Sequence, residues 1–138
     1  EELRQAAIVT ADEVYQSYIM REINSGKYPA YKASGMAYIR FAKEEKELFK
    51  LLFMRDRGGE DLSPTPDFEA SVDMIMKANG VTREQATRMH LEMWARTHGI
   101  ATMIATSFLQ LEDTLISEML SDVYQGIRAR HVPEEDKA

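Results

Sequence analysis

The sequence predicts an all-helical fold, and two observations support this prediction. Apolar residues recur every three or four positions through most of the 138-residue chain, which is the spacing of one face of an α-helix. No segment alternates apolar and polar residues for long enough to form a β-strand. We therefore expect about five or six helices in one domain, residues 1–130, followed by a polar tail, residues 131–138.

The first predicted helix covers residues 2–24, where apolar side chains share one face. These side chains are Leu3, Ala7, Ala11, Val14, Tyr15 and Tyr18. Gly26 and Pro29 end the helix, since glycine accepts left-handed backbone angles and proline cannot continue a helix. A second helix follows Pro29, and a charged break at residues 43–46 separates it from the strongly apolar segment 48–54, which should be buried.

Residues 55–66 contain two glycines and two prolines, and they form the one clear long loop. A short amphipathic helix is expected at residues 68–79. Thr82 and Gln85 then match a capping box, in which each side chain bonds to the backbone of the other residue. The helix that begins there is about 40 Å long. Gly99 within it costs about 1 kcal/mol relative to alanine, so we expect another segment to approach closely at that point.

The last two predicted helices carry more apolar surface than one chain is expected to cover. The final helix, residues 111–130, has an apolar stripe, and the second half of the long helix is apolar on more than one side. Such surfaces suit a two-fold dimer in which each protomer gives two helices to a four-helix bundle. The predicted interface residues are Ile104, Phe108, Leu115, Met119, Val123 and Tyr124. Burial of the same residues within a monomer is the alternative.

Charge and composition argue against several classes of protein. Lysine and arginine total 17 against 23 acidic residues, and a net charge of -6 repels phosphate, so we do not expect this chain itself to bind DNA. The chain has no cysteine, which suits a reducing compartment. No apolar run approaches the roughly 20 residues of a membrane span. We expect a cytoplasmic protein without membrane contact.

The three histidines are the natural place to look for catalysis or metal binding. His90 and His98 lie about 12 Å apart along a helix, too far to share one ion, and neither follows a glutamate at the spacing of a bundle metal site. The sequence also lacks a nucleophile motif and a phosphate-binding loop. We expect no metal, no cofactor and no catalytic residue. The alternative is a small helical enzyme in which His98 works with Glu92, Glu112 or Asp113.

Nine methionines and twelve aromatic residues favour an adaptable apolar cavity, although an ordinary helical core explains many of them. Polar groups are mixed into apolar faces on the first helix and the long helix, as in pockets that orient a small molecule. The predicted pocket residues are Tyr15, Tyr18, Met36, Phe53, Met89, Met93, Trp94 and Thr97. For His98, a structural role is favoured over ligand contact. A protein-interaction module without a cavity is a further alternative.

Three local motifs occur in an order that has a known parallel. The first motif is the opening Glu1-Glu2-Leu3, and the second is the segment 31–53 with its aromatic-alanine helix and apolar turn. The third is Trp94 followed by His98-Gly99. In this respect the chain resembles the C-terminal ligand-binding and dimerisation domain of the TetR/AcrR family of bacterial transcriptional regulators. The tryptophan and the His-Gly pair are similar to the signature of one branch, and residues 108–127 continue into the family's last helix.

The resemblance implies a homodimeric repressor that senses an apolar or amphipathic small molecule. The ligand would enter among the first, second, fourth and fifth helices, tilt the first helix and respace two DNA-reading heads. DNA would be bound only through a helix-turn-helix module that precedes this sequence in the family. Such a ligand can act only by its differential affinity for the two states.

Overall fold

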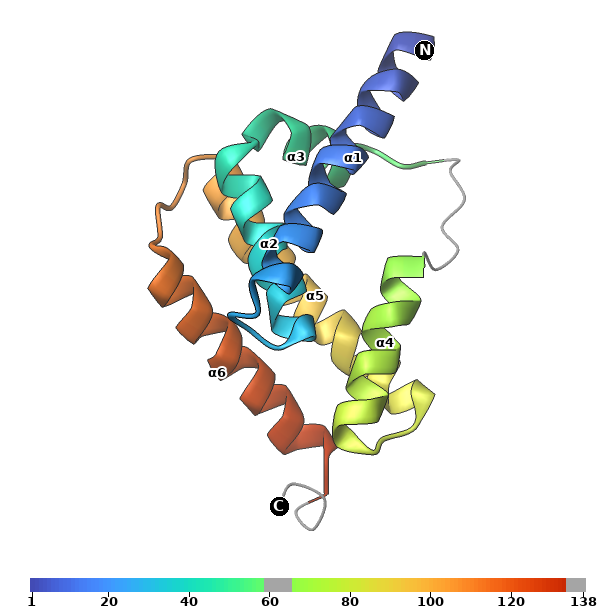
Figure 1. Ribbon diagram of the computed structural model, residues 1–138, viewed down its shortest axis with the longest axis vertical. Coiled ribbons are helices and arrows are strands. Elements are labelled where there is room, and N and C mark those ends of the chain that lie inside the picture. The colour runs from blue at the N-terminus through green and yellow to red at the C-terminus, as the bar shows by residue number, and fades with distance from the viewer. Residues whose placement is uncertain (59–65, 134–138) are drawn as a thin grey trace.

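The structure, a computed structural model, describes residues 1–58 and 66–133, and these residues form six helices and no strand (Figure 1). The helices are α1 (Glu2–Ser25), α2 (Ala30–Glu44), α3 (Lys46–Phe53), α4 (Pro66–Asn79), α5 (Arg83–Ala105) and α6 (Asp113–His131). The all-helical prediction is confirmed. Most of the predicted loop at 55–66, and the end of the predicted tail, lie outside the described residues.

The helix ends follow the local chemistry that the sequence predicted. Gly26 after α1 and Gly80 after α4 adopt left-handed backbone angles, with φ of 68° and 66°. At the start of α5 the backbone N–H of Gln85 donates to the Thr82 hydroxyl at 3.1 Å, and the Thr82 N–H donates to the Gln85 side chain at 3.0 Å. The predicted capping box is therefore confirmed.

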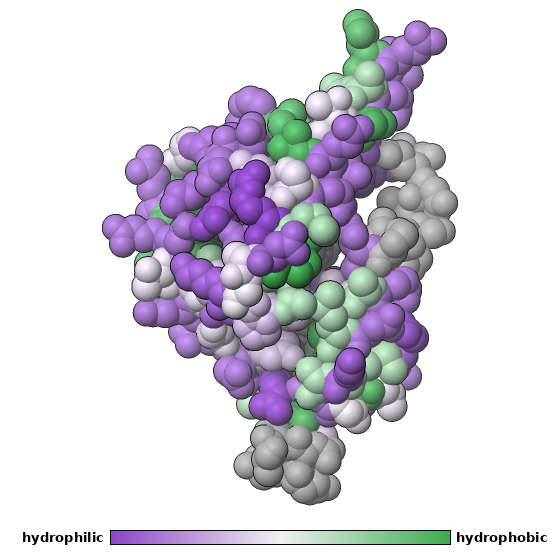
Figure 2. All heavy atoms as spheres, in the orientation of Figure 1, coloured by the Kyte–Doolittle hydropathy of each residue, from purple (hydrophilic) through white to green (hydrophobic). Residues whose placement is uncertain are grey.

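Helix α2 is the central element and packs against every other helix. Helix α6 and the N-terminal end of α4 lie on opposite sides of the molecule, while the N-terminal end of α1 projects from it (Figure 1). Figure 2 shows hydrophilic side chains over most of this face, and apolar side chains beside hydrophilic ones along that projecting end. There Leu3 is 87% exposed and Val9 is 56% exposed.

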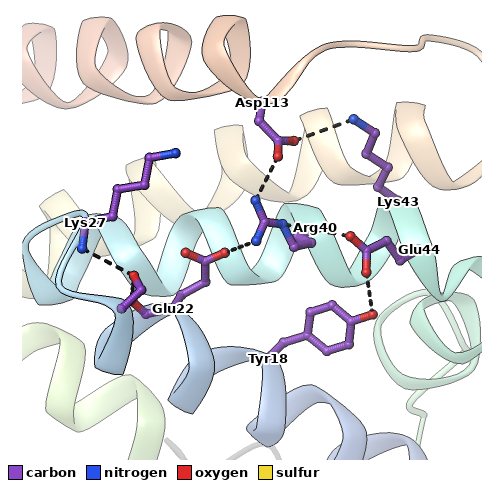
Figure 3. Close-up of polar contacts among 8 residues, drawn as sticks. Tyr18, Glu22, Lys27, Arg40, Lys43, Glu44 and Asp113 are labelled. Atoms are coloured by element: carbon purple, nitrogen blue, oxygen red, sulfur yellow. Dashed lines mark hydrogen bonds and ion pairs between the residues drawn. The ribbon is translucent and has the colours of Figure 1, made fainter.

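A polar seam fixes the register of three helices (Figure 3). The Arg40 guanidinium on α2 lies 2.5 Å from the Glu22 carboxylate on α1 and 2.7 Å from the Asp113 carboxylate on α6. The Tyr18 hydroxyl donates to Glu44 at 2.9 Å, again between α1 and α2. We call Glu22, Arg40 and Asp113 the polar seam.

The apolar interior is divided into two clusters. The main core is built from α1, α2, α3, α5 and α6, with Phe41 and Phe49 completely buried. The smaller core joins α4, the start of α5 and the residue after α6. Its members are Val72, Ile75, Val81, Ala86, Met89 and Val132. Tyr31 and Ile127 pack against both clusters.

Two details differ from the sequence-based expectations. A Cβ atom added at Gly99 would have no neighbour within 4 Å, so the close approach expected there is wrong for this chain. The close approach occurs at Gly35, where a Cβ would lie 3.3 Å from Leu120. Helix α6 continues to His131, and Val132 is buried, whereas the predicted domain ended at residue 130.

None of the helices formed by residues 1–58 and 66–133 combines the length and the hydropathy that a membrane span requires.

Candidate ligand-binding site

A cavity of about 950 Å³ lies between the helices, and all six helices contribute to its wall. Its volume is within the range of small-molecule sites. Aromatic and aliphatic side chains supply most of the wall, and polar groups are placed among them at a few points. The apolar lining consists chiefly of Leu52, Phe53, Phe68, Leu91, Met93, Trp94 and Leu120.

Two tyrosine–histidine pairs connect α2 with α5 beside the cavity. The Tyr31 hydroxyl forms a hydrogen bond with His90 Nδ1 at 2.9 Å, and the Tyr38 hydroxyl forms one with His98 Nδ1 at 2.6 Å. Tyr31, Tyr38 and His90 line the cavity. The two tyrosines are seven residues apart on α2, and the two histidines are eight residues apart on α5. The two pairs therefore lie about two helical turns from each other along both helices.

Burial disfavours the charged forms of these groups. Desolvation lowers the pKa of His90 to about 4 and raises the pKa of Tyr31 and of Tyr38 well above their ordinary value. Burial also lowers the pKa of His98, and the charge of Arg57 acts in the same direction. Tyr31, Tyr38 and His90 therefore give the cavity wall neutral hydrogen-bonding groups.

One wall of the cavity is an aromatic cluster. Tyr15 of α1 contacts Phe53 of α3 and Tyr38 of α2, with ring centroids 5.0 and 5.9 Å apart. Burial, together with the charges of Asp67 and Asp12, raises the pKa of Tyr15. A molecule in the cavity would thus touch a side chain of α1 directly.

Five of the predicted pocket residues line this cavity, and three lie elsewhere. The lining residues are Tyr15, Phe53, Met93, Trp94 and Thr97. Tyr18 is buried against Phe41, where desolvation and the bond to Glu44 raise its pKa to about 12. Met36 is 2% exposed in the main core, and Met89 is completely buried in the smaller core.

Several cavity residues were not predicted from the sequence. Tyr31, Lys32 and Tyr38 come from α2, and Ser121 comes from α6. The spacing of tyrosines on α2 and histidines on α5 was a usable signal, because matched two-turn spacings allow paired contacts between adjacent helices.

Comparison with known proteins agrees with this architecture. Residues 31–135 match the family model described as a tetracyclin repressor-like C-terminal domain, which covers most of the chain. The chain belongs to this family. No curated protein and no solved structure gave a match. Family membership confirms the resemblance that the sequence motifs indicated.

The six predicted interface residues lie in different surroundings in this tetracyclin repressor-like domain. Phe108 and Leu115 are exposed, at 76% and 45%. Met119 and Val123 are half-buried on α6, and Val123 lines a groove of about 740 Å³ between α5 and α6. Ile104 lies inside the main core at 3% exposure, and Tyr124 lines the cavity, where its hydroxyl accepts a hydrogen bond from Asn79 at 2.9 Å.

Two of the three carboxylates considered as partners of His98, namely Glu92 and Asp113, are engaged elsewhere in the tetracyclin repressor-like domain. Glu92 pairs with His131 at 3.0 Å, and Asp113 pairs with Arg40. His98 instead bonds to Tyr38 and stacks on Trp94, with ring centroids 5.5 Å apart. Within residues 1–58 and 66–133, no three metal-ligating side chains are grouped closely enough to hold an ion.

Proposed function

We propose that this domain senses a small molecule and dimerises as part of a transcriptional regulator that represses its target genes. DNA would be bound by a separate helix-turn-helix module of the same protein, and the ligand would control that module from a distance. The observation that carries the proposal is the large, mostly apolar cavity with a few neutral polar groups in a domain of this family.

The route from ligand to DNA-binding module would run through α1. Tyr15 and Asp12 of α1 belong to the cavity wall, so a bound molecule would change the contacts of α1 with α3 and α4. The projecting end of α1, with Leu3 and Val9 exposed, fits contact with a preceding module. A ligand that binds one tilt of α1 more tightly than another would shift the population of the two states.

The dimer would use α5 and α6. Phe108 and Leu115 are large exposed apolar side chains near the junction of these two helices. The groove between the same helices has small residues, Ala95 and Gly126, in its wall, which would allow a partner helix to approach closely. An isologous contact of this surface gives a four-helix bundle.

Native mass spectrometry of the purified chain tests both parts of the proposal in one measurement. We expect a dimer, and extra mass on it would come from a retained small molecule. A monomer at micromolar concentration would contradict the dimer, whereas an empty dimer would support the assembly and leave the cavity to be tested by ligand titration.

Two substitutions separate dimerisation from sensing. Phe108→Asp places a charge on the proposed interface and should give a folded monomer, so a dimer of unchanged stability would refute that interface. Trp94→Ala removes a cavity wall and should weaken ligand binding at least about tenfold while the dimer remains. Unchanged affinity would remove Trp94 from the ligand site.

A further inference from the structure

The cavity is electrically asymmetric, and its charged groups lie at different ends. Lys32, at the α2–α6 side, lines the cavity and donates a hydrogen bond to the Ser121 hydroxyl at 2.8 Å. Asp12 and Asp67 line the α1–α4 side, where Asp67 accepts a hydrogen bond from Gln16 of α1 at 2.8 Å. Figure 1 shows α6 and the N-terminal end of α4 on opposite sides of the molecule.

Within the described part of the chain, Lys32 lacks the carboxylate partner that several other cationic side chains of this domain have. Arg40, Lys43 and Arg83 each lie within 4.0 Å of at least one carboxylate. Lys32 has no such carboxylate among the described residues, although it is half-buried. Its ammonium group lies 5.1 Å from the Tyr28 ring centroid and uses one of its three N–H donors on Ser121. Donors therefore remain for a group inside the cavity.

The remaining polar groups explain why an anion would be held at one end. Arg57 also lines the cavity, and because its guanidinium donates to the neutral Leu52 carbonyl it keeps its charge, which adds to the attraction for an anionic ligand. The two aspartates at the other side would repel an anion by charge. An anionic group would be placed at Lys32, where the Ser121 hydroxyl supplies a second polar partner, and an apolar body would extend along Trp94 and Phe68.

We infer that the ligand of this cavity is an amphipathic organic acid, with one anionic group bound by Lys32 and Ser121 and an apolar body along the aromatic wall. This inference rests on the proposed sensing function and assigns the chemical class of the ligand. A carboxylate and a phosphate monoester share the required chemistry, because both accept charge-assisted hydrogen bonds from an ammonium group.

Binding can be followed through Trp94, the single tryptophan of the chain, which lines the cavity. Decanoate, decyl phosphate, decanol and decyltrimethylammonium, each below its micelle concentration, provide one apolar body with four head groups. We expect the two anions to bind at least about tenfold more tightly than decanol, as a charge-assisted hydrogen bond implies. Decanoate and decyl phosphate, compared with each other, distinguish the two acids.

Lys32→Met keeps the apolar stem and removes the charge, so it should abolish the preference for anions while decanol binding stays unchanged. Lys27→Met is the matched control, because the Lys27 ammonium also lies over the Tyr28 ring, at 5.4 Å, without lining the cavity. Circular dichroism of both variants establishes that they are folded.

The results separate the inference from the function on which it rests. Equal binding of decanoate and decanol, tightest binding of the cation, or an undiminished anion preference in Lys32→Met would overturn the assignment and leave a sensor of another ligand class. Absence of any Trp94 response with all four probes, confirmed by calorimetry, would overturn the sensing function together with the inference.

Discussion

Replacement of Arg40 by methionine should destabilise the domain far more than its partly exposed position suggests. The Glu22 side chain, 2.5 Å from Arg40, is only 6% exposed, while the Arg40 side chain is 28% exposed. Without Arg40, the Glu22 carboxylate would stay buried without its cation. Removing one partner of a buried ion pair costs about 3–5 kcal/mol. The more exposed contacts of Arg40 with Asp113 and Glu44 add at most about 1 kcal/mol each.

The matched control is Arg83→Met. Arg83 also pairs with two carboxylates, Glu69 at 2.9 Å and Asp73 at 2.5 Å, but the side chains of all three residues are at least half exposed. Its loss should therefore cost about 1 kcal/mol or less. Comparison of the two variants separates the effect of carboxylate burial on stability from the effect of the number of ion pairs.

Urea unfolding, followed by circular dichroism at one protein concentration, measures both effects. With a slope of about 2 kcal/mol/M, Arg40→Met should lower the midpoint by about 2 M and Arg83→Met by less than about 0.5 M. In the double variant Glu22→Leu/Arg40→Met, most of the loss should be recovered, since no buried charge remains. Equal midpoints for Arg40→Met and Arg83→Met would refute the reasoning.

Three further predictions concern pH and the helix ends. The pKa of His90, lowered by burial to about 4, makes the folded state bind fewer protons than the unfolded state between roughly pH 6.5 and 4, so stability should fall as pH drops through that window. NMR titration of the imidazole checks this, and a midpoint near 6.5 would contradict it. Thr82→Ala should cost about 1 kcal/mol through loss of the capping box, whereas Thr106→Ala, outside any N-cap, should cost less than half of that in urea unfolding. Gly80→Ala should lose about 1 kcal/mol because of its positive φ, and Gly99→Ala should gain up to about 1 kcal/mol, since its Cβ meets nothing in the protomer. Destabilisation by Gly99→Ala would place another chain against that face.

The sequence predicted the helices well because their ends are decided locally. Gly26, Gly80 and the Thr82–Gln85 capping box act through their own backbone angles and hydrogen bonds, which do not depend on the rest of the fold. The apolar stripes likewise state which face of each helix is covered.

Periodicity does not indicate which other helix packs against that face. The position of the cavity depends on this packing, so it could not be predicted from the sequence. Met36 and Met93 are both buried methionines, yet only Met93 borders the cavity. Similarly, Ile104 and Phe108 are four residues apart and were expected on one surface. Helix α5 ends at Ala105, and Ser107 turns the chain with a φ of 63°, so Ile104 points into the core while Phe108 is exposed.

The division of the apolar interior into two clusters has a consequence for how the protein opens. The smaller core, formed mainly by α4 and the start of α5, contains fewer buried apolar residues than the main core, and Tyr31 and Ile127 pack against both. Such a unit can unfold by itself at a lower free energy than the whole domain. Amide hydrogens of α4 should then exchange with solvent faster than those of α2. A ligand that contacts Phe68 of α4 and Tyr38 of α2 at the same time would make the two clusters unfold together. It should therefore slow the exchange of the α4 amide hydrogens.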